Sequence, residues 1–176
     1  KFFTDIEKIT KNGNGIKTYL YVPAFLTTDD EKIIAERSER FDGLYCEGSF
    51  GLFLAKRLKK EFFGGVELNV THRLTYGELE ASADKISFSK ELSYDELKSM
   101  SSGGFVLCGG SIKIMSLEYC PFGKKCDSCK RADGFTLKDY DGRAFRVRRY
   151  KLSSCRFEVY NCWPLKADMR FENEIY

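Results

Sequence analysis

The chain has 176 residues, of which 43% are hydrophobic and 31% are charged, and its formal net charge is +3. A chain of this size and balance forms one globular domain or slightly more, and it buries enough apolar surface to fold without disulfides. No apolar run approaches the ~20 residues of a membrane-spanning helix, and seven cysteines without a secretion signal favour a reduced, cytoplasmic protein over a disulfide-stapled one.

Strands and helices alternate up to residue 119, where β-rich apolar runs are separated by helix signals. Acidic residues after Thr28 mark one helix start, and Ser93 with Glu96 forms a capping box at another. The helix predicted over residues 49–60 is expected to point Leu52, Phe53, Ala55 and Leu58 inward. The predicted strands span residues 18–22, 43–46, 62–70, 85–89, 105–108 and 112–117, and the other predicted helices begin at Thr28 or span residues 74–83 and 93–100.

Strands that alternate with helices over connections of roughly ten to fifteen residues form βαβ units and a parallel sheet. About four or five such units are too few to close an eight-stranded barrel, so the fold is either a small open sheet or part of a larger barrel. The chain begins at Lys1, inside a charged helical pattern, as a piece of a longer protein would, and this favours the second alternative. We therefore predict an α/β fold with partial TIM-barrel-like βα repeats.

The composition changes after Pro121, where Gly, Lys, Asp and Cys become frequent. Asp141 and Gly142 lie between two alternating runs and predict a β-hairpin. We predict strands at residues 135–138, 145–148 and 157–160, which form a small β-rich cysteine subdomain. The expected organisation is a βα-repeat region over residues 1–119, the cysteine subdomain over residues 120–165, and a frayed polar tail over residues 166–176.

Four cysteines in this subdomain have the spacing of a metal site. Cys120, Cys126, Cys129 and Cys155 follow the pattern C-x5-C-x2-C-x25-C. A C-x2-C pair lets two thiolates reach one metal from a tight turn, and distant cysteines complete the shell. The spacing predicts either a structural zinc or a 4Fe–4S cluster, which the residues alone do not distinguish. The remaining cysteines, Cys46, Cys108 and Cys162, are expected to be packing residues.

Candidate catalytic residues are few. His72 is the only histidine, and it follows a predicted strand at the place where barrel active sites lie, although a lone histidine is more often structural. A cysteine protease would need Cys46 or Cys108 beside His72, and the sequence has no Ser–His–Asp order, HExxH or GxSxG motif. Four polar side chains at or near predicted strand ends are candidates for a substrate pocket: Glu47, Glu67, Asn69 and Glu118.

Basic residues are concentrated between residues 124 and 158. Arg143, Arg146, Arg148 and Arg149 form the centre of this excess, followed by Lys151. Such a cluster fits either an anion-binding surface for RNA or a solvated strand pair with alternating charges.

Several segments together resemble peptidase family U32, the collagenase-like peptidases. The most specific are Glu-Tyr-Cys-Pro at residues 118–121, Leu-x-Asp-x-x-Gly-x-x-Phe at residues 137–145, and Cys-Arg, Tyr-Asn and Pro-Leu at residues 155–156, 160–161 and 164–165. Residues 43–47, 64–69 and 89–93 are also similar to segments of that family. The resemblance covers most of the chain, from about residue 19 to residue 165.

The resemblance implies the C-terminal half of a TIM-barrel-like protein, whose partner is the missing N-terminal half. It implies an enzyme that either hydrolyses peptides or takes part in hydroxylation of RNA or of a small aromatic acceptor, in some members with a 4Fe–4S cluster held by four cysteines. In that context His72 and Glu118 are the catalytic candidates. The alternative is a non-catalytic, metal-stabilised domain that binds RNA or a protein partner. In either case we expect the isolated chain to be inactive, because a barrel site is assembled from loops of all the strands.

Overall fold

The structure is a computed structural model, and it describes residues 17–100, 103–123, 134–167 and 170–175. The chain divides into two compact units. Among the described residues, we call those within Gly109–Lys166 the β unit, and we call those from Lys17 to Cys108, together with those within Ala167–Tyr176, the βα unit. The boundary therefore lies at residue 108 rather than at the predicted residue 119. Within the described part of the chain, no helix is long and apolar enough to cross a lipid bilayer.

The βα unit contains a parallel sheet in which strands that follow one another in the chain are neighbours. The strands β1 to β4 pair in the order β1-β2-β3-β4, all parallel. A parallel bridge from Ser87 to Phe105 continues the array towards β5, and β12 pairs with β5 in parallel. The predicted βαβ units and α/β class are thus confirmed. The bounds are β1 Tyr19–Val22, β2 Gly43–Cys46, β3 Glu61–Gly64, β4 Lys85–Ile86, β5 Val106–Leu107 and β12 Glu174–Ile175.

Two predicted elements of this unit differ from the structure. The strand predicted over residues 62–70 ends at Gly64, because a short 3₁₀ helix, η2 (Val66–Leu68), follows it. The polar tail predicted as frayed instead contributes β12, whose backbone pairs with β5. A two-residue strand has no periodicity that a sequence pattern can reveal, and only its partner strand stabilises it.

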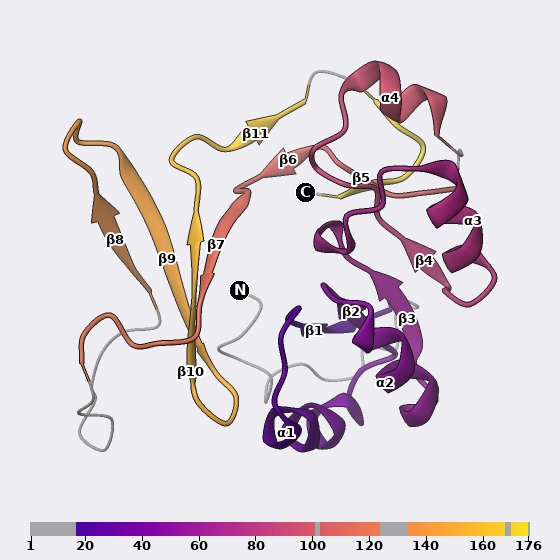
Figure 1. Ribbon diagram of the computed structural model, residues 1–176, viewed down its shortest axis with the longest axis horizontal. Helices are drawn as coiled ribbons and strands as arrows, with labels where there is room; N and C mark the ends of the chain where they lie inside the picture. The colour runs from indigo at the N-terminus through magenta and orange to yellow at the C-terminus, as the bar shows by residue number, and fades with distance from the viewer. Residues whose placement is uncertain (1–16, 101–102, 124–133, 168–169, 176) are drawn as a thin grey trace. The chain divides into compact units, whose positions relative to one another are not determined.

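Helices connect the parallel strands (Figure 1), and α1 and α4 begin with capping boxes. The cap of α1 is Thr27 rather than Thr28: its side chain accepts a hydrogen bond from the Asp30 N–H at 3.2 Å. Ser93 and Glu96 form the predicted capping box of α4. The helices are α1 Thr28–Ser38, α2 Phe50–Leu58, α3 Arg73–Glu80 and α4 Tyr94–Ser99.

The two faces of the parallel sheet have different surroundings. One face carries Leu44, Cys46, Phe62 and Ile86, all buried. The helix α2 packs on this face through Gly51, so the predicted inward position of Phe53 is wrong, and Phe53 is 70% exposed. The opposite face is aromatic and only half-buried. Its rings are close to one another: Tyr19–Phe63, Tyr21–Tyr45, Tyr45–Phe63 and Phe63–Phe105, with centroids 4.8–6.2 Å apart.

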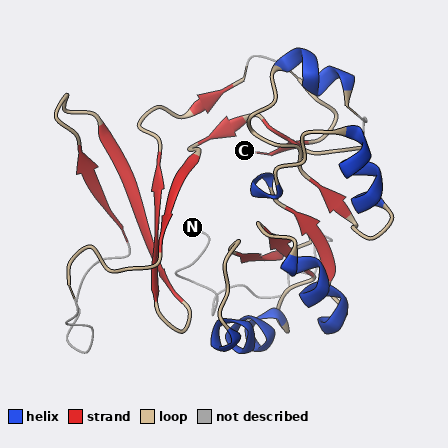
Figure 2. Cartoon of the chain, viewed as in Figure 1, coloured by secondary structure: helices blue, strands red, loops and turns tan. Residues whose placement is uncertain are grey.

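The β unit is built on an antiparallel sheet in the order β7-β10-β9-β8 (Figure 2). The turn between β8 and β9 contains Gly142 at φ +78°, so the predicted Asp-Gly hairpin is confirmed. Val147, Phe157 and Val159 form its buried core. The segment predicted as a sixth parallel strand is β7, which pairs with β10 instead. The bounds are β6 Gly109–Gly110, β7 Lys113–Leu117, β8 Gly134–Lys138, β9 Ala144–Lys151, β10 Cys155–Tyr160 and β11 Leu165–Lys166.

Candidate functional site

Polar side chains gather at the carboxyl edge of the parallel sheet. Glu47 directly follows β2, Glu67 and Asn69 follow β3, and Ser89 follows β4 by a few residues. The carboxyl ends of parallel strands meet at one edge, which is where open and closed α/β sheets bind ligands. Backbone hydrogen bonds align this edge, because the Glu47 N–H donates to the Val22 carbonyl at 2.9 Å and the Ser87 N–H to the Gly64 carbonyl at 2.8 Å.

Direct contacts link the loops after β3 and β4. The Lys90 ammonium is 2.5 Å from a Glu67 carboxylate oxygen, and both side chains are about three-quarters buried or slightly more. The Ser89 hydroxyl donates a hydrogen bond to the Asn69 side-chain oxygen at 2.6 Å. Asn69 adopts a left-handed backbone conformation at φ +56°, which Asn tolerates better than most residues, and this turns the chain after η2. Three of the polar residues expected from the sequence, Glu47, Glu67 and Asn69, therefore lie at one edge.

The structure adds Tyr45 to this cluster, which the sequence analysis missed. Its hydroxyl accepts a hydrogen bond from the Val66 N–H at 3.3 Å. A Cβ at Gly65 would lie 2.8 Å from the ring, so a glycine is required there for this approach. Burial, and next the nearby Glu47 carboxylate, raise the pKa of Tyr45 to about 12. Strand alternation was the available signal, because Tyr45 precedes Glu47 by two residues and therefore lies on the same face.

This edge contains groups suited to acid–base chemistry. Glu47 is 6% exposed, and its charge and that of Glu67 both act on the Tyr45 phenol. The phenol stays protonated at neutral pH, so it can donate a hydrogen bond to a substrate oxygen. A carboxylate can accept a proton from a bound water or substrate. The Lys90 ammonium can donate a hydrogen bond to a carbonyl oxygen or pair with a negatively charged group. We call Tyr45, Glu47, Glu67, Asn69 and Lys90 the edge cluster.

The two catalytic candidates from the sequence have structural partners. His72 is the N-cap of α3, where its Nδ1 atom accepts a hydrogen bond from the Leu74 N–H at 3.1 Å. Glu118 lies at a strand end, directly after β7, but this strand belongs to the antiparallel sheet. It forms an ion pair with Arg156, whose side chain is buried, while the Glu118 side chain is 63% exposed.

Of the four predicted metal ligands, Cys126 and Cys129 lie outside the described residues. Cys120 and Cys155 are half-buried, and both pack against the Val147–Phe157–Val159 core. Pairing of Phe157 with Leu117 brings Cys155 at the start of β10 and Cys120 just after β7 to the same end of the ladder. Two cysteines at one end of a sheet fit one half of a four-thiolate shell. Among the described residues, no group of three or more metal-ligating side chains is assembled.

Two of the other cysteines, Cys46 and Cys108, are packing residues as the sequence predicts. Cys46 and Cys108 are buried in the core of the βα unit, and Cys162 is half-buried. Burial raises the pKa of the Cys46 thiol to about 12, with a smaller contribution from Glu47. A cysteine nucleophile needs a thiolate and access to substrate. Cys46 has neither, which argues against the cysteine-protease alternative for this residue.

The four arginines expected to form an anion-binding surface do not share one face. Arg143 lies in the β8–β9 turn, where it forms ion pairs with Asp139 at 2.6 Å and Asp141 at 2.8 Å. Side chains alternate between the two faces of a strand. Arg146 and Arg148 therefore point to one face of β9, and Arg149 points to the other. Only Arg146 and Arg148 of this set can contact the same ligand on one face of the sheet.

In comparisons with known proteins, no family model, curated protein or solved structure matched the chain. The resemblance to peptidase family U32 therefore stays a prediction that rests on the motif residues.

Proposed function

We propose that the chain is part of a U32-type βα-barrel enzyme that binds its substrate at the edge cluster. The observation that carries this proposal is the strand order β1-β2-β3-β4-β5-β12, which never reverses. In a doubly wound sheet the order reverses at a switch point, and helices cover both faces. Right-handed crossovers between successive neighbours put all helices on one face, and only closure of the sheet covers the other face.

The half-buried aromatic face agrees with such closure. Tyr21, Tyr45, Phe63 and Phe105 are the side chains that would fill the interior of the barrel. The described residues supply six parallel strands, so a barrel of eight needs two more from the rest of the parent protein, which is less than the missing half that the resemblance implies. The edge cluster would then lie at the mouth of the barrel.

The reaction that fits these groups best is hydrolysis of a peptide bond. Glu47, buried beside the phenol, would accept the proton of an attacking water and then donate it to the nitrogen of the leaving amine as the C–N bond breaks. The Tyr45 hydroxyl would donate a hydrogen bond to the carbonyl oxygen, where negative charge develops. Glu67 and Lys90 would orient the substrate backbone through their remaining hydrogen-bonding capacity.

The test is a peptide-hydrolysis assay on the chain alone and on the chain combined with the strands that complete its barrel. We expect activity only in the combination, and a loss of at least ~100-fold in kcat/KM for Glu47→Gln. Glu78→Gln, an exposed position on α3, is the matched control. Full activity of the 176-residue chain by itself, or of Glu47→Gln, would contradict the proposal.

A second candidate, hydroxylation of RNA or of a small aromatic acceptor, is favoured by one observation, the placement of Cys120 and Cys155 at the same end of the β7–β10 ladder. Together with Cys126 and Cys129 they would hold the metal, and a 4Fe–4S cluster would supply electron transfer whereas zinc would only stabilise the fold. Anaerobic purification with iron and zinc analysis and an absorbance scan near ~400 nm separates these cases. Cys155→Ser should lower the bound metal, and an unchanged metal content would exclude this ligand set. Metal without either activity would favour a binding or scaffold domain.

A further inference from the structure

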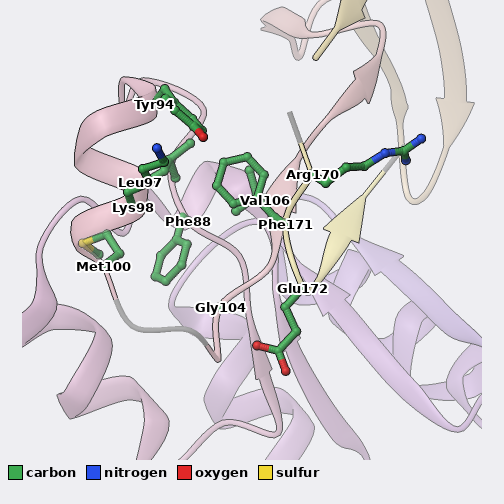
Figure 3. Close-up of a pocket in the computed structure, with 10 residues that line it drawn as sticks. All are labelled: Phe88, Tyr94, Leu97, Lys98, Met100, Gly104, Val106, Arg170, Phe171 and Glu172. Atoms are coloured by element: carbon green, nitrogen blue, oxygen red, sulfur yellow. The ribbon is translucent and has the colours of Figure 1, made fainter. Parts of the chain in front are cut away.

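A pocket of about 270 Å³ lies between α4 and the C-terminal segment of the βα unit (Figure 3). Its wall combines residues from the segment after β4, from α4, from β5 and its preceding loop, and from the segment before β12. No residue of the edge cluster lines it. Its charged lining residues are Lys98, Arg170 and Glu172, and its apolar ones include Phe88, Leu97, Met100 and Phe171.

The course of the chain explains why this pocket exists. In a βα array each strand is normally followed by a helix that covers it. After β5 the chain instead enters the β unit at Gly109, so α4 and residues 170–172 cover this part of the sheet. Gly104 keeps the floor open, because a Cβ there would lie closer than 3.0 Å to the Phe88 ring and displace it. The pocket therefore results from the way in which α4 and residues 170–172 cover the sheet and from the space that Gly104 leaves.

The pocket combines apolar side chains with two cations, Lys98 and Arg170, and with the carboxylate of Glu172, which lies away from Lys98 in Figure 3. The rings of Tyr94 and Phe171 meet edge to face, with centroids 5.9 Å apart. The Lys98 ammonium lies 4.2 Å from the centroid of the Tyr94 ring, and both residues line the pocket. Arg170 points away from the other lining side chains in Figure 3, and it pairs with Glu174 at 3.5 Å. Lys98 is thus the cation best placed to meet a ligand in the pocket.

We propose that this pocket binds a small apolar carboxylate, with its ring or branched chain between Phe88, Leu97 and Phe171 and its carboxylate on Lys98. An apolar cavity of about 150 Å³ accepts benzene, so 270 Å³ holds a body of roughly ten heavy atoms. A single ammonium matches a single negative charge. The proposal is independent of the reaction at the edge cluster.

The test is a titration of the ¹⁵N-labelled chain with 4-methylpentanoate, phenylacetate, phenylacetamide and 2-phenylethylamine, followed by amide chemical shifts. The two carboxylates should shift amides of α4 and of residues 104–106 and 170–172 with a Kd of about 1 mM, as expected for ligands of this size. The amide and the amine should bind at least ~5-fold more weakly, because only the carboxylates pair with Lys98.

Three variants test whether binding depends on Lys98 and occurs in this pocket. Lys98→Met should remove the preference for carboxylates, whereas Lys56→Met, an exposed lysine on α2, should leave it unchanged. Met100→Trp should fill the pocket and abolish binding of all four probes, with circular dichroism as the check of folding. Equal binding of carboxylate and amine, shifts elsewhere than the pocket, or no saturable shift would overturn the proposal.

Discussion

Two glycines in helices of the βα unit lead to opposite predictions for the same substitution. Gly51 lies in the first turn of α2 and faces β2, where a Cβ would come closer than 3.0 Å to the Cβ and Sγ of Cys46. Gly77 lies within α3, and a Cβ there would have no heavy atom within 4 Å. Cys46 directly precedes Glu47, so the approach of α2 to β2 also positions the edge cluster.

The magnitudes follow from two competing effects. Replacing glycine by alanine within a helix stabilises it by about 1 kcal/mol. Gly77→Ala should therefore stabilise the βα unit by about 0.5–1 kcal/mol. At Gly51 the new methyl group must displace α2 from the sheet, and overpacking of this kind costs about 1–3 kcal/mol. Gly51→Ala should therefore destabilise the unit by about 1–2 kcal/mol.

Urea unfolding followed at 222 nm measures both variants, because the helices of the described residues all belong to the βα unit. Fluorescence of the single tryptophan, Trp163, reports on the β unit and should show an unchanged midpoint. If Gly51→Ala stabilised the chain as much as Gly77→Ala, α2 would not pack on β2 through this turn, and the placement of Glu47 would be wrong.

Three further outcomes are expected. His72→Ala should cost about 0.5–1 kcal/mol of stability in urea unfolding, and His72→Asn should restore most of it, because Asn also caps helices. Burial holds the pKa of Cys46 and Tyr45 at about 12, above their ordinary 9.0 and 10.0, so unfolding free energy should fall as pH rises from about 9 towards 12. In the Cys46→Ser variant the unfolding free energy should begin to fall nearer pH 10, because only the Tyr45 phenol, with an ordinary pKa of 10.0, then contributes. Arg146→Ala should weaken binding to single-stranded RNA and reduce its salt slope by about 1, measured by filter binding, whereas Arg143→Ala should not, because Arg143 is already paired with aspartates.

Local signals in the sequence predicted much of the fold. The Ser93–Glu96 capping box and the Asp141-Gly142 turn depend on contacts within a few residues, and both occur as predicted. Which strand pairs with which in a sheet could not be predicted in the same way. Residues 113–117 form a strand, but an apolar run of five residues carries no information on whether its neighbour is parallel or antiparallel.

Residues of the edge cluster could be predicted from the sequence only where they lie at the predicted ends of strands. Glu47, Glu67 and Asn69 were found because polar residues after a parallel strand lie at a common edge. Tyr45 was missed because an aromatic residue within a strand is ordinarily a packing residue, and only the Val66 N–H and the space at Gly65 reveal its role. Ala55 on α2 is buried as predicted, but Phe53 was assigned to the inward face wrongly, because apolar residues occur on all sides of that helix and Phe53 fits either face by periodicity.

The path of the chain between β5 and β12 links the stability of the two units. The chain leaves the βα unit through β6 and returns through β11, and these two strands pair with each other in the β unit. Without that pairing, bringing β12 to β5 would close a loop of roughly 66 residues. With the β6–β11 pairing, the loop has roughly eight residues. The loop length therefore differs by about three doublings, which lowers the entropic cost of closing the loop by about 2 kcal/mol.

Unfolding of the β unit should therefore loosen β12 selectively. The Val106 N–H donates to the Asn173 carbonyl at 3.0 Å, and this bond reports on the β5–β12 pair. Phe157→Ala removes a core side chain that is 1% exposed, which costs about 3–5 kcal/mol in the β unit. Hydrogen exchange at Val106 should then accelerate by about tenfold or more, while exchange at Gly65, whose N–H donates to the Cys46 carbonyl at 2.7 Å within the β2–β3 pair, should not change. Equal acceleration at both amides would mean that the units unfold together, and no change at either would mean that β12 holds its place without the β unit.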